Sequence, residues 1–267
     1  MSSATVFSIP GQRKSVENAT RWLENSKPKH DAILLGLPQD LEHFVQAYVQ
    51  GDISEDELWK SYRLMTGLLR PVADSLRSKL KPLFSYLPTV ARKRDAEIYC
   101  YDDLATHIQS GKSAERILLL SYRAKVRSNI DLEEWRQILV EELRIGKPAW
   151  KRSLENLVEK TIPNVENAIF YEGLLGPLVK HLKDSGVSVK AVHMSTYWRA
   201  PLDALRTAAS WKGETYLTKE NIRKAVELHM KYLGTVISSS DLDESERRWA
   251  QMASFRKNSQ DDASTSS

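Results

Sequence analysis

The sequence contains one cysteine, Cys100, among 267 residues. An intrachain disulfide and a cysteine metal cluster are therefore both excluded. Cys100 lies in the apolar run Ile98-Tyr99-Cys100-Tyr101, which favours a buried structural thiol over a nucleophile. Glycine and proline are also scarce, at 11 and 10 residues, so we expect no long irregular regions outside the chain ends.

Long hydrophobic runs are missing as well. No apolar run approaches the roughly 18 residues that a membrane-spanning helix needs. Segment 1–10 lacks a basic stretch followed by an apolar one, which argues against a secretory signal. We therefore expect a cytoplasmic protein with no membrane partner.

Neither sign of charge dominates, because 39 Lys and Arg residues face 35 Asp and Glu residues, for a net charge of +4. This balance permits a nucleic-acid or other anionic partner without requiring one, and a solvated mixed surface is the simpler interpretation. The usual catalytic and nucleotide-binding motifs are also missing. The sequence has no phosphate-binding glycine-rich loop, dinucleotide fingerprint, His-Glu-x-x-His or Gly-x-Ser-x-Gly. We expect no cofactor.

Short β-prone runs alternate with amphipathic helical segments near both ends of the chain. Residues 32–35 form a continuous apolar run, which is typical of a strand buried on both faces of a parallel sheet. A helix that begins near Ser15 separates it from a strand at 5–9, and this order predicts a parallel crossover. Gly and Pro at 146–148 predict an interruption in the long helical middle.

Several residues have the character of helix caps. Ser54 to Glu57 forms a capping-box pattern, which predicts the start of a helix. Asp131 and Thr218 each precede an amphipathic segment as expected N-caps, and Gly186 follows another as an expected C-cap.

These patterns predict a helix-rich α/β fold, with a mainly parallel central sheet of about four to five strands, a large helical insertion and C-terminal helices. We expect one domain over residues 1–256. Its predicted parts, with the tail, are a strand–helix–strand unit at 5–40, a mostly helical insertion at 41–160 with a strand near 96–101, a second α/β unit at 165–215, C-terminal helices at 216–256 and a disordered Ser/Asp-rich tail at 257–267.

Acidic residues follow several predicted strands. Asp40 follows the second strand, Asp102 and Asp103 follow the strand near 96–101, and Glu172 follows the strand at 167–171. The carboxyl ends of parallel strands meet at one edge of a sheet, where ligands commonly bind. Carboxylates there suit metal binding or acid–base chemistry, although Asp is also the ordinary helix cap, which we favour for these residues.

His193 is the best placed of the six histidines, because it follows the predicted strand at 187–192. With Glu172 and Asp102 it forms a candidate catalytic set for a hydrolase, and the alternative is a packed structural histidine. His229 lies on the apolar stripe of its helix, which predicts a core residue. The other histidines are predicted to face solvent: His30, His43, His107 and His181.

Basic residues cluster at 13–14, 92–94 and 123–127. Clustered cations suit phosphate contacts, but no RNA- or DNA-binding motif accompanies them, and a solvated charged face is the commoner meaning. The candidate ligand-binding residues are Arg13, Lys14, Asp40, Asp103 and Gly173.

Two parts of the chain resemble one known superfamily. The runs 6–11 and 31–38 are similar to the first strand–helix–strand unit of the TraB / Tiki / ChaN / erythromycin-esterase superfamily. The run 168–176 is similar to that superfamily's late strand and Gly-x-x-His segment. The resemblance covers mainly residues 5–40, 96–110 and 165–195, and it rests on the order of elements more than on individual residues.

The departures from the superfamily concern its metal donors. The first histidine position falls within 10–12, where no histidine stands, and Gly36 occupies the place of the usual acidic residue. The late histidine position falls on Leu174 or Leu175. A divalent ion needs several oxygen or nitrogen ligands, which these side chains do not supply. The resemblance therefore implies a scaffold without its metal site.

Three functional hypotheses follow. The first is a non-catalytic, strongly diverged TraB/Tiki-like protein, in effect a pseudoenzyme, that acts as a binding or accessory component with an unidentified protein partner. The second is a divergent hydrolase with a relocated site around His193, Glu172 and Asp102. The third is a nucleic-acid-associated accessory protein. The sequence does not predict the substrate, the partner or the oligomeric state.

Overall fold

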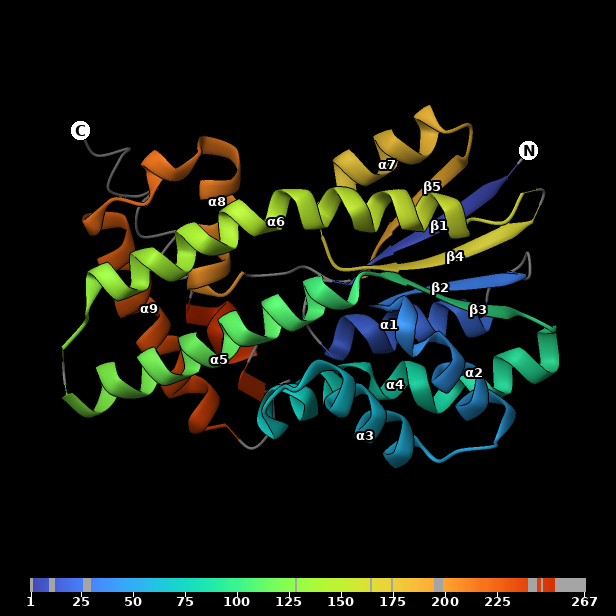
Figure 1. Cartoon of the computed structure of the whole chain (residues 1–267), viewed down its shortest axis with the longest axis horizontal. Coiled ribbons are helices and arrows are strands. Elements are labelled where there is room, and N and C mark those ends of the chain that lie inside the picture. The colour runs from blue at the N-terminus through green and yellow to red at the C-terminus, as the bar shows by residue number, and fades with distance from the viewer. Residues whose placement is uncertain are drawn as a thin grey trace. The chain divides into compact units, whose positions relative to one another are not determined.

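The computed structural model describes most of the chain (Figure 1). Its described residues are 2–9, 13–25, 30–127, 129–163, 165–173, 175–194, 199–239, 244–245 and 247–252. The predicted tail at 257–267 lies outside them. The elements in chain order are β1 (Ser3–Ser8), α1 (Arg13–Asn25), β2 (Ala32–Pro38), the 3-10 helix η1 (Gln39–Leu41), α2 (Glu42–Gln50), α3 (Glu55–Thr66), α4 (Arg70–Arg94), β3 (Glu97–Asp102), α5 (Leu104–Arg127), α6 (Leu132–Lys160), β4 (Glu166–Tyr171), α7 (Leu175–Asp184), β5 (Ser188–His193), α8 (Pro201–Lys212), the 3-10 helix η2 (Glu214–Tyr216) and α9 (Lys219–Ile237).

The strands form one parallel sheet of five, in the order β3-β2-β4-β1-β5. The predicted helix-rich α/β fold with a parallel sheet is confirmed. The run 32–35 lies in β2 and is buried on both faces, as its uniform apolar character predicted. β4 pairs with both β1 and β2, so a strand from late in the chain separates the first two strands.

The chain divides into two compact units. The first comprises Met1–Glu115 and Ile145–Ser195, and the second comprises Arg116–Arg144 and Thr196–Ser267. Helices α5 and α6 each contribute residues to both units. The expectation of one domain over 1–256 stays a prediction.

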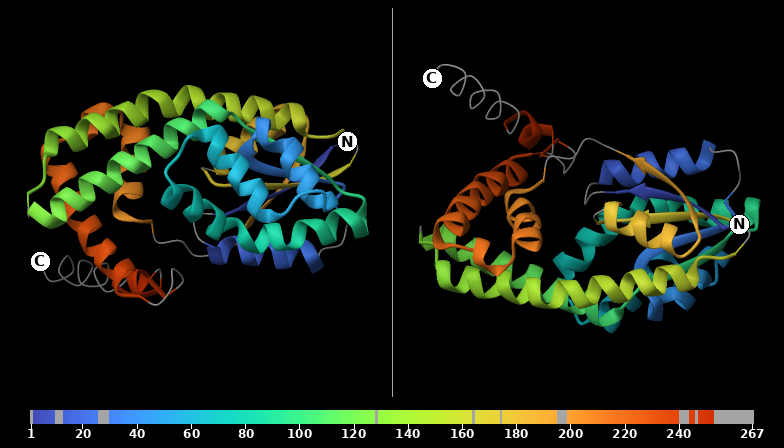
Figure 2. Two further views of the ribbon diagram at one scale, coloured as in Figure 1. Left: turned by 60° about the horizontal axis from the view of Figure 1, so that its bottom comes forward. Right: turned by 90° about the horizontal axis from the view of Figure 1, so that it is seen from above.

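In the first unit, helices cover both faces of the sheet (Figures 1 and 2). Alternate strand side chains point to opposite faces, so Phe7 and Val6 enter different clusters. Phe7 packs in a cluster with residues of α1 to α4, including Leu23 and Phe84. Val6 packs in a cluster with residues of α6 and α7, including Leu157 and Leu178.

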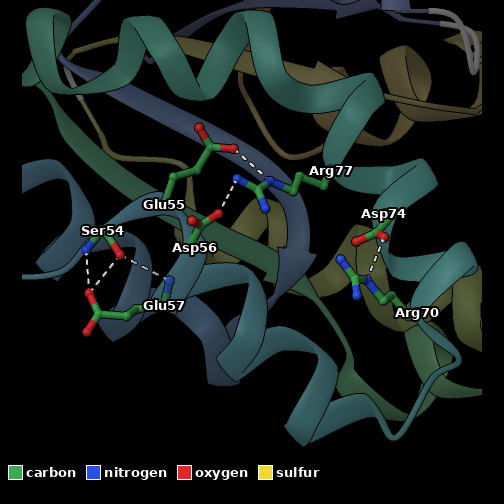
Figure 3. A network of polar contacts seen from close by, with 7 residues as sticks. All are labelled: Ser54, Glu55, Asp56, Glu57, Arg70, Asp74 and Arg77. Carbon is green, nitrogen blue, oxygen red and sulfur yellow. Dashed lines mark hydrogen bonds and ion pairs between the residues drawn. The ribbon is translucent and has the colours of Figure 1, made fainter.

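Polar contacts join α3 to α4 in the same unit (Figure 3). The predicted capping box is present: the Ser54 hydroxyl accepts from the Glu57 amide at 3.3 Å, and the Ser54 amide donates to Glu57 at 2.8 Å. From α4, Arg77 reaches Glu55 at 2.9 Å and Asp56 at 2.6 Å. Burial alone would lower the pKa of Arg77, but the hydrogen bonds that Arg77 donates to these carboxylates raise it.

The second unit is helical, and its core gathers residues of α5, α6, α8 and α9 around Trp135, which is wholly buried. Its helices begin at predicted caps. Asp131 accepts the amides of Glu133 and Glu134 at 3.1 and 3.0 Å, and Thr218 accepts the amide of Asn221 at 3.2 Å. Among the described residues, no helix is both long enough and apolar enough to cross a membrane.

Several local predictions were wrong. Ser15 lies inside α1, buried, and does not begin it. Asp40 lies in η1, and its side chain does not cap α2, whose N-cap is Leu41. Helix α6 continues through 146–148, and α4 likewise contains Pro82 and Pro88. Packing of a long amphipathic helix outweighs the hydrogen bond that a single proline removes.

Candidate functional site at the carboxyl edge of the sheet

The candidate residues at the carboxyl ends of the strands do not form one cluster. Asp102 ends β3 and His193 ends β5, and these strands are the two edges of the sheet, with three strands between them. At about 4.8 Å per strand, four steps separate the strand ends by roughly 19 Å. Glu172 follows the central strand β4. The catalytic role of His193, Glu172 and Asp102 stays a prediction, and the sheet order does not bring His193 to Asp102.

Glu172 and Gly173 follow β4 and contact neighbouring side chains. Glu172 forms an ion pair with Lys79 of α4. A Cβ atom on Gly173 would lie 2.6 Å from the Tyr171 ring, so glycine allows that ring to fold over the end of its own strand. The Tyr171 hydroxyl accepts a hydrogen bond from Trp150 Nε1 of α6 at 2.8 Å. The centre of this edge is therefore filled by aromatic side chains.

The Tyr101 side chain crosses β2 at Gly36. Its hydroxyl donates to the carbonyl of Phe170, in β4, at 2.8 Å, so the phenol reaches from β3 over β2 to the next strand. A Cβ atom on Gly36 would lie 3.0 Å from that hydroxyl. The pairing of β2 with β3 shifts register between Leu35 and Pro38, which places the close approach at an irregularity of the ladder. Burial, reinforced by the charge of Asp102, raises the pKa of Tyr101 well above its usual value.

This crossing accounts for glycine at the position where the superfamily resemblance expects an acidic residue. The phenol of Tyr101, which is 3% exposed, passes beside the place where a side chain at Gly36 would begin. The backbone of Gly36 does not need a positive φ, so space explains this glycine and chain conformation does not. Of the other positions that the resemblance assigns to the motif, 10–12 and Leu174 lie outside the described residues, and Leu175 begins α7 and packs, partly buried, against the cluster that contains Val6.

Asp102 is joined instead to a histidine that the sequence did not single out. His107 Nε2 lies 3.1 Å from Asp102 Oδ2, and His107 Nδ1 lies 3.3 Å from the Tyr62 hydroxyl of α3. With Asp102 as a carboxylate and the imidazole neutral, Nε2–H donates to Asp102 and Nδ1 accepts from the Tyr62 hydroxyl. Burial, with the charge of Asp102, raises the pKa of Tyr62 to about 12, so the phenol keeps its proton at neutral pH.

The first turn of α5 explains this arrangement. Asp103 caps the helix by accepting from the amide of Thr106 at 3.2 Å and from its hydroxyl at 3.0 Å, and Arg152 donates to the same oxygen at 3.3 Å. Burial alone would raise the pKa of Asp103, but these hydrogen bonds lower it. The cap turns the chain so that His107 faces back toward the end of β3. The sequence signal for the pair was a histidine one helical turn after a strand-terminal aspartate, and no signal identified Tyr62.

The remaining candidates are dispersed. Arg13 and Lys14 are exposed in the first turn of α1, where Lys14 donates to Glu17 at 2.8 Å, and Asp40 is exposed in η1. His193 is exposed at the end of β5. Over the part of the chain that the structure describes, no group of three or more His, Cys, Asp or Glu side chains is arranged to hold a metal ion.

Two further histidine predictions are resolved. His229 is buried in the second unit, as predicted, and lies beside Trp135 with ring centroids 6.3 Å apart. His30 is 1% exposed and not solvent-facing, because it packs against Phe7 and Trp22, with centroids 6.3 and 5.9 Å away. His107 is also largely covered.

Comparison with known proteins identifies no relative. The chain shows no significant similarity to any protein-family model, to any curated protein or to any solved structure.

Proposed function

We propose that the protein acts by binding, as a non-catalytic, strongly diverged TraB/Tiki-like accessory component. The observation that supports this most directly is the Tyr101 hydroxyl, which crosses Gly36 and bonds to the Phe170 carbonyl. In the superfamily an acidic metal donor is expected at that strand end. Here the same place holds the buried phenol of Tyr101, whose hydroxyl already donates a hydrogen bond to the Phe170 carbonyl.

The carboxylates nearby are also engaged. Asp103 serves as a helix cap, Glu172 pairs with Lys79, and Asp102 accepts from His107. A divalent ion gains from a carboxylate only when that group can turn its oxygens toward the ion, and each of these would first lose an existing partner. The edge therefore favours a packed surface that another molecule contacts from outside.

Assays with ester, phosphomonoester and peptide model substrates, with and without added Zn²⁺, Mn²⁺ or Fe²⁺, test the proposal. We expect the full chain to give no rate above that of heat-denatured protein. Hydrolysis that follows the folded protein through purification and disappears in Asp102→Asn would overturn it.

A divergent hydrolase is the second candidate, and the Asp102–His107–Tyr62 chain favours it. A carboxylate that fixes the tautomer of a histidine is the arrangement that prepares a general base. In this form of the hypothesis His107 replaces His193 as the base, while Asp102 is retained from the predicted set. For His107 to act as a base, Nδ1 would have to lose the hydrogen bond from Tyr62, which is 3% exposed, and open toward solvent.

Two histidine variants separate the candidates. If the edge is a hydrolytic site, His107→Ala abolishes turnover while His193→Ala, at the other edge strand, leaves it intact. If the protein only binds, both variants are equally inactive and His107→Ala changes stability alone. Thermal unfolding of each variant shows whether a loss of rate reflects loss of fold.

Nucleic-acid association and a cytoplasmic location both stay predictions. Lys14 and Arg123, from two of the basic clusters, form ion pairs with Glu17 and Glu134. These pairs do not favour nucleic-acid binding by either cluster. A filter-binding assay at low and moderate salt addresses nucleic acid directly, because phosphate contacts weaken steeply with salt.

A further inference from the structure

Helix α5 presents a second apolar face to solvent within the second unit. Leu118, Leu119, Tyr122 and Val126 are 52%, 49%, 67% and 63% exposed. Single exposed apolar residues are ordinary, but these four lie within about two turns of one helix. We call them the α5 stripe.

The α5 stripe lies opposite the buried side of the same helix. At about 100° per residue, its four members span an arc of roughly 100°. The residues that enter the core, Ile117, Leu120 and Ala124, lie on the other side. A helix that packs only on its own unit typically carries polar and charged residues on its outer face. The apolar outer face of α5 therefore indicates a surface that contacts another molecule.

The spacing of the stripe suits another helix. Leu118, Tyr122 and Val126 follow each other at i, i+4 and i+8, which forms the ridge that packs into the groove of a second helix. The ridge is about 12 Å long, at 1.5 Å per residue.

The charges beside the stripe define the partner. Segment 116–127 contains Arg116, Arg123, Lys125 and Arg127 and no acidic residue. Arg116 and Arg123 pair with Glu141 and Glu134 of α6. Within the described residues, Lys125 and Arg127 form no ion pair. Lys125 lies about 20° from Leu118 around the helix axis and so flanks the stripe. Arg127 lies about 80° beyond Leu119, at a hollow that Asp131 and Glu134 also line, so Lys125 is the cation best placed for a partner on the stripe.

We propose that the α5 stripe binds an acidic amphipathic helix of another protein, with its apolar ridge on Leu118, Tyr122 and Val126 and a carboxylate beside Lys125. A second copy of this chain is disfavoured, because two cationic segments without a carboxylate would face each other. The surface belongs to the second unit and does not use the residues of the sheet edge. The inference therefore goes beyond the proposed function and does not depend on it.

The probe is a synthetic helical peptide of about four turns, with leucine at i, i+3, i+4 and i+7 and glutamate along both flanks. A matched peptide carries lysine in place of each glutamate. Fluorescence anisotropy of labelled peptide with the full chain is expected to show binding of the acidic peptide and at least about tenfold weaker binding of the basic one. Equal affinity for both peptides, or no binding of the acidic one, overturns the proposal.

Variants locate the site. Leu118→Ser with Tyr122→Ser, and separately Lys125→Glu, are each expected to weaken binding at least about tenfold. The matched control is Leu64→Ser, which changes a 70% exposed leucine on α3 and is expected to leave binding unchanged. All are exposed positions, and far-UV circular dichroism confirms the fold. An effect of the control as large as that of the stripe variants contradicts the assignment.

Two measurements distinguish the other occupants. Sedimentation equilibrium is expected to show no self-association through the stripe, and a dimer abolished by the Leu118/Tyr122 variant would assign the stripe to a second copy. Co-sedimentation with phosphatidylglycerol vesicles is expected to be unaffected by that variant. Vesicle binding that the variant abolishes would assign the stripe to an anionic lipid surface and overturn the proposal.

Discussion

Gly36 and Tyr101 should be energetically coupled, because the Tyr101 phenol passes where a side chain at position 36 would begin. In Gly36→Ala the new Cβ atom lies 3.0 Å from the Tyr101 hydroxyl and 3.4 Å from Cζ. Overpacking of this kind costs about 1–3 kcal/mol, and the lower chain entropy of alanine offsets about 0.4–1 kcal/mol of it. We expect a net loss of about 1–2 kcal/mol in the stability of the first unit.

Removing the hydroxyl should relieve that loss. Tyr101→Phe alone deletes the hydrogen bond to Phe170, at a cost of about 1 kcal/mol. In the double variant the nearest remaining atom is Cζ, at ordinary contact distance once the ring shifts by a few tenths of an ångström. In the Tyr101→Phe background, Gly36→Ala should then leave the free energy of unfolding almost unchanged. The coupling energy between the two sites is therefore expected to be about 1 kcal/mol or more.

Cys100 provides an assay specific to this sheet. It is the only cysteine in the sequence, it is wholly buried, and burial together with the charge of Glu42 raises the pKa of its thiol. Labelling by a disulfide reagent such as DTNB therefore requires the sheet to open, and about 1.4 kcal/mol corresponds to a tenfold change in rate. Gly36→Ala is expected to speed labelling about 5–30-fold, and the double variant is expected to label hardly faster than Tyr101→Phe.

Gly146→Ala is the matched control, because a Cβ atom there meets nothing within 4 Å and the glycine lies exposed inside α6. That variant should label no faster than the wild-type chain, since alanine stabilises an exposed helix interior by up to about 1 kcal/mol. The reasoning is refuted if the Gly36 and Tyr101 effects add within about 0.5 kcal/mol, or if Gly36→Ala labels at the wild-type rate.

Three other changes have expected outcomes. Burial, with the charge of Arg206, lowers the pKa of His229 to about 4 from 6.5, so between these pH values the unfolded chain binds a proton that the folded chain does not. The free energy of unfolding should therefore fall by roughly 3 kcal/mol as the pH drops from about 6.5 to 4. In urea unfolding, His229→Gln should flatten that pH dependence, and an unchanged slope would contradict the assignment. A Cβ atom on Gly111 would clash with the Leu68 side chain, so Gly111→Ala should lower the free energy of unfolding by about 1–3 kcal/mol, as measured by Cys100 labelling. The same loss in a Leu68→Ala background would show that the clash is elsewhere. Asp103→Ala should cost about 1 kcal/mol by removing the cap of α5, and Asp103→Asn, which still caps, should cost less; equal costs would contradict the cap.

Much of the fold could be predicted from local patterns. The uniformly apolar run at 32–35 predicted a strand buried on both faces, and polar caps such as Ser54, Asp131 and Thr218 marked helix starts correctly. The Gly186 cap of α7 was also predicted, and its φ of 80° allows the amide of Val187 to reach Leu182 at 3.0 Å. These features depend on residues close in sequence, where side-chain chemistry acts directly.

Proline positions were less informative. A proline weakens a helix locally, but Pro82, Pro88 and Pro148 lie in helices of 25 and 29 residues whose apolar faces pack along their length. Burial summed over such a face exceeds the cost of one missing hydrogen bond. Local breakers therefore fail as boundary signals where tertiary packing is extensive.

The candidate site was predicted less well, because strand order is not a local property. His193 and Asp102 both end parallel strands, yet β5 and β3 are the two edge strands of the sheet, with β1, β4 and β2 between them. His107 was assigned to solvent, whereas the cap at Asp103 turns it onto Asp102. His30 was also assigned to solvent, and its burial depends on the packing of Phe7 and Trp22 from two other elements.

The metal content of the purified full chain tests the central claim most directly, namely that paired side chains close the carboxyl edge of this sheet. Elemental analysis by inductively coupled plasma mass spectrometry should follow purification without chelators and dialysis against Zn²⁺, Mn²⁺ and Fe²⁺. We expect far less than one equivalent of any of these metals per chain, with no change in Asp102→Asn. One equivalent that survives dialysis against buffer and is lost in Asp102→Asn or His107→Ala would contradict the claim.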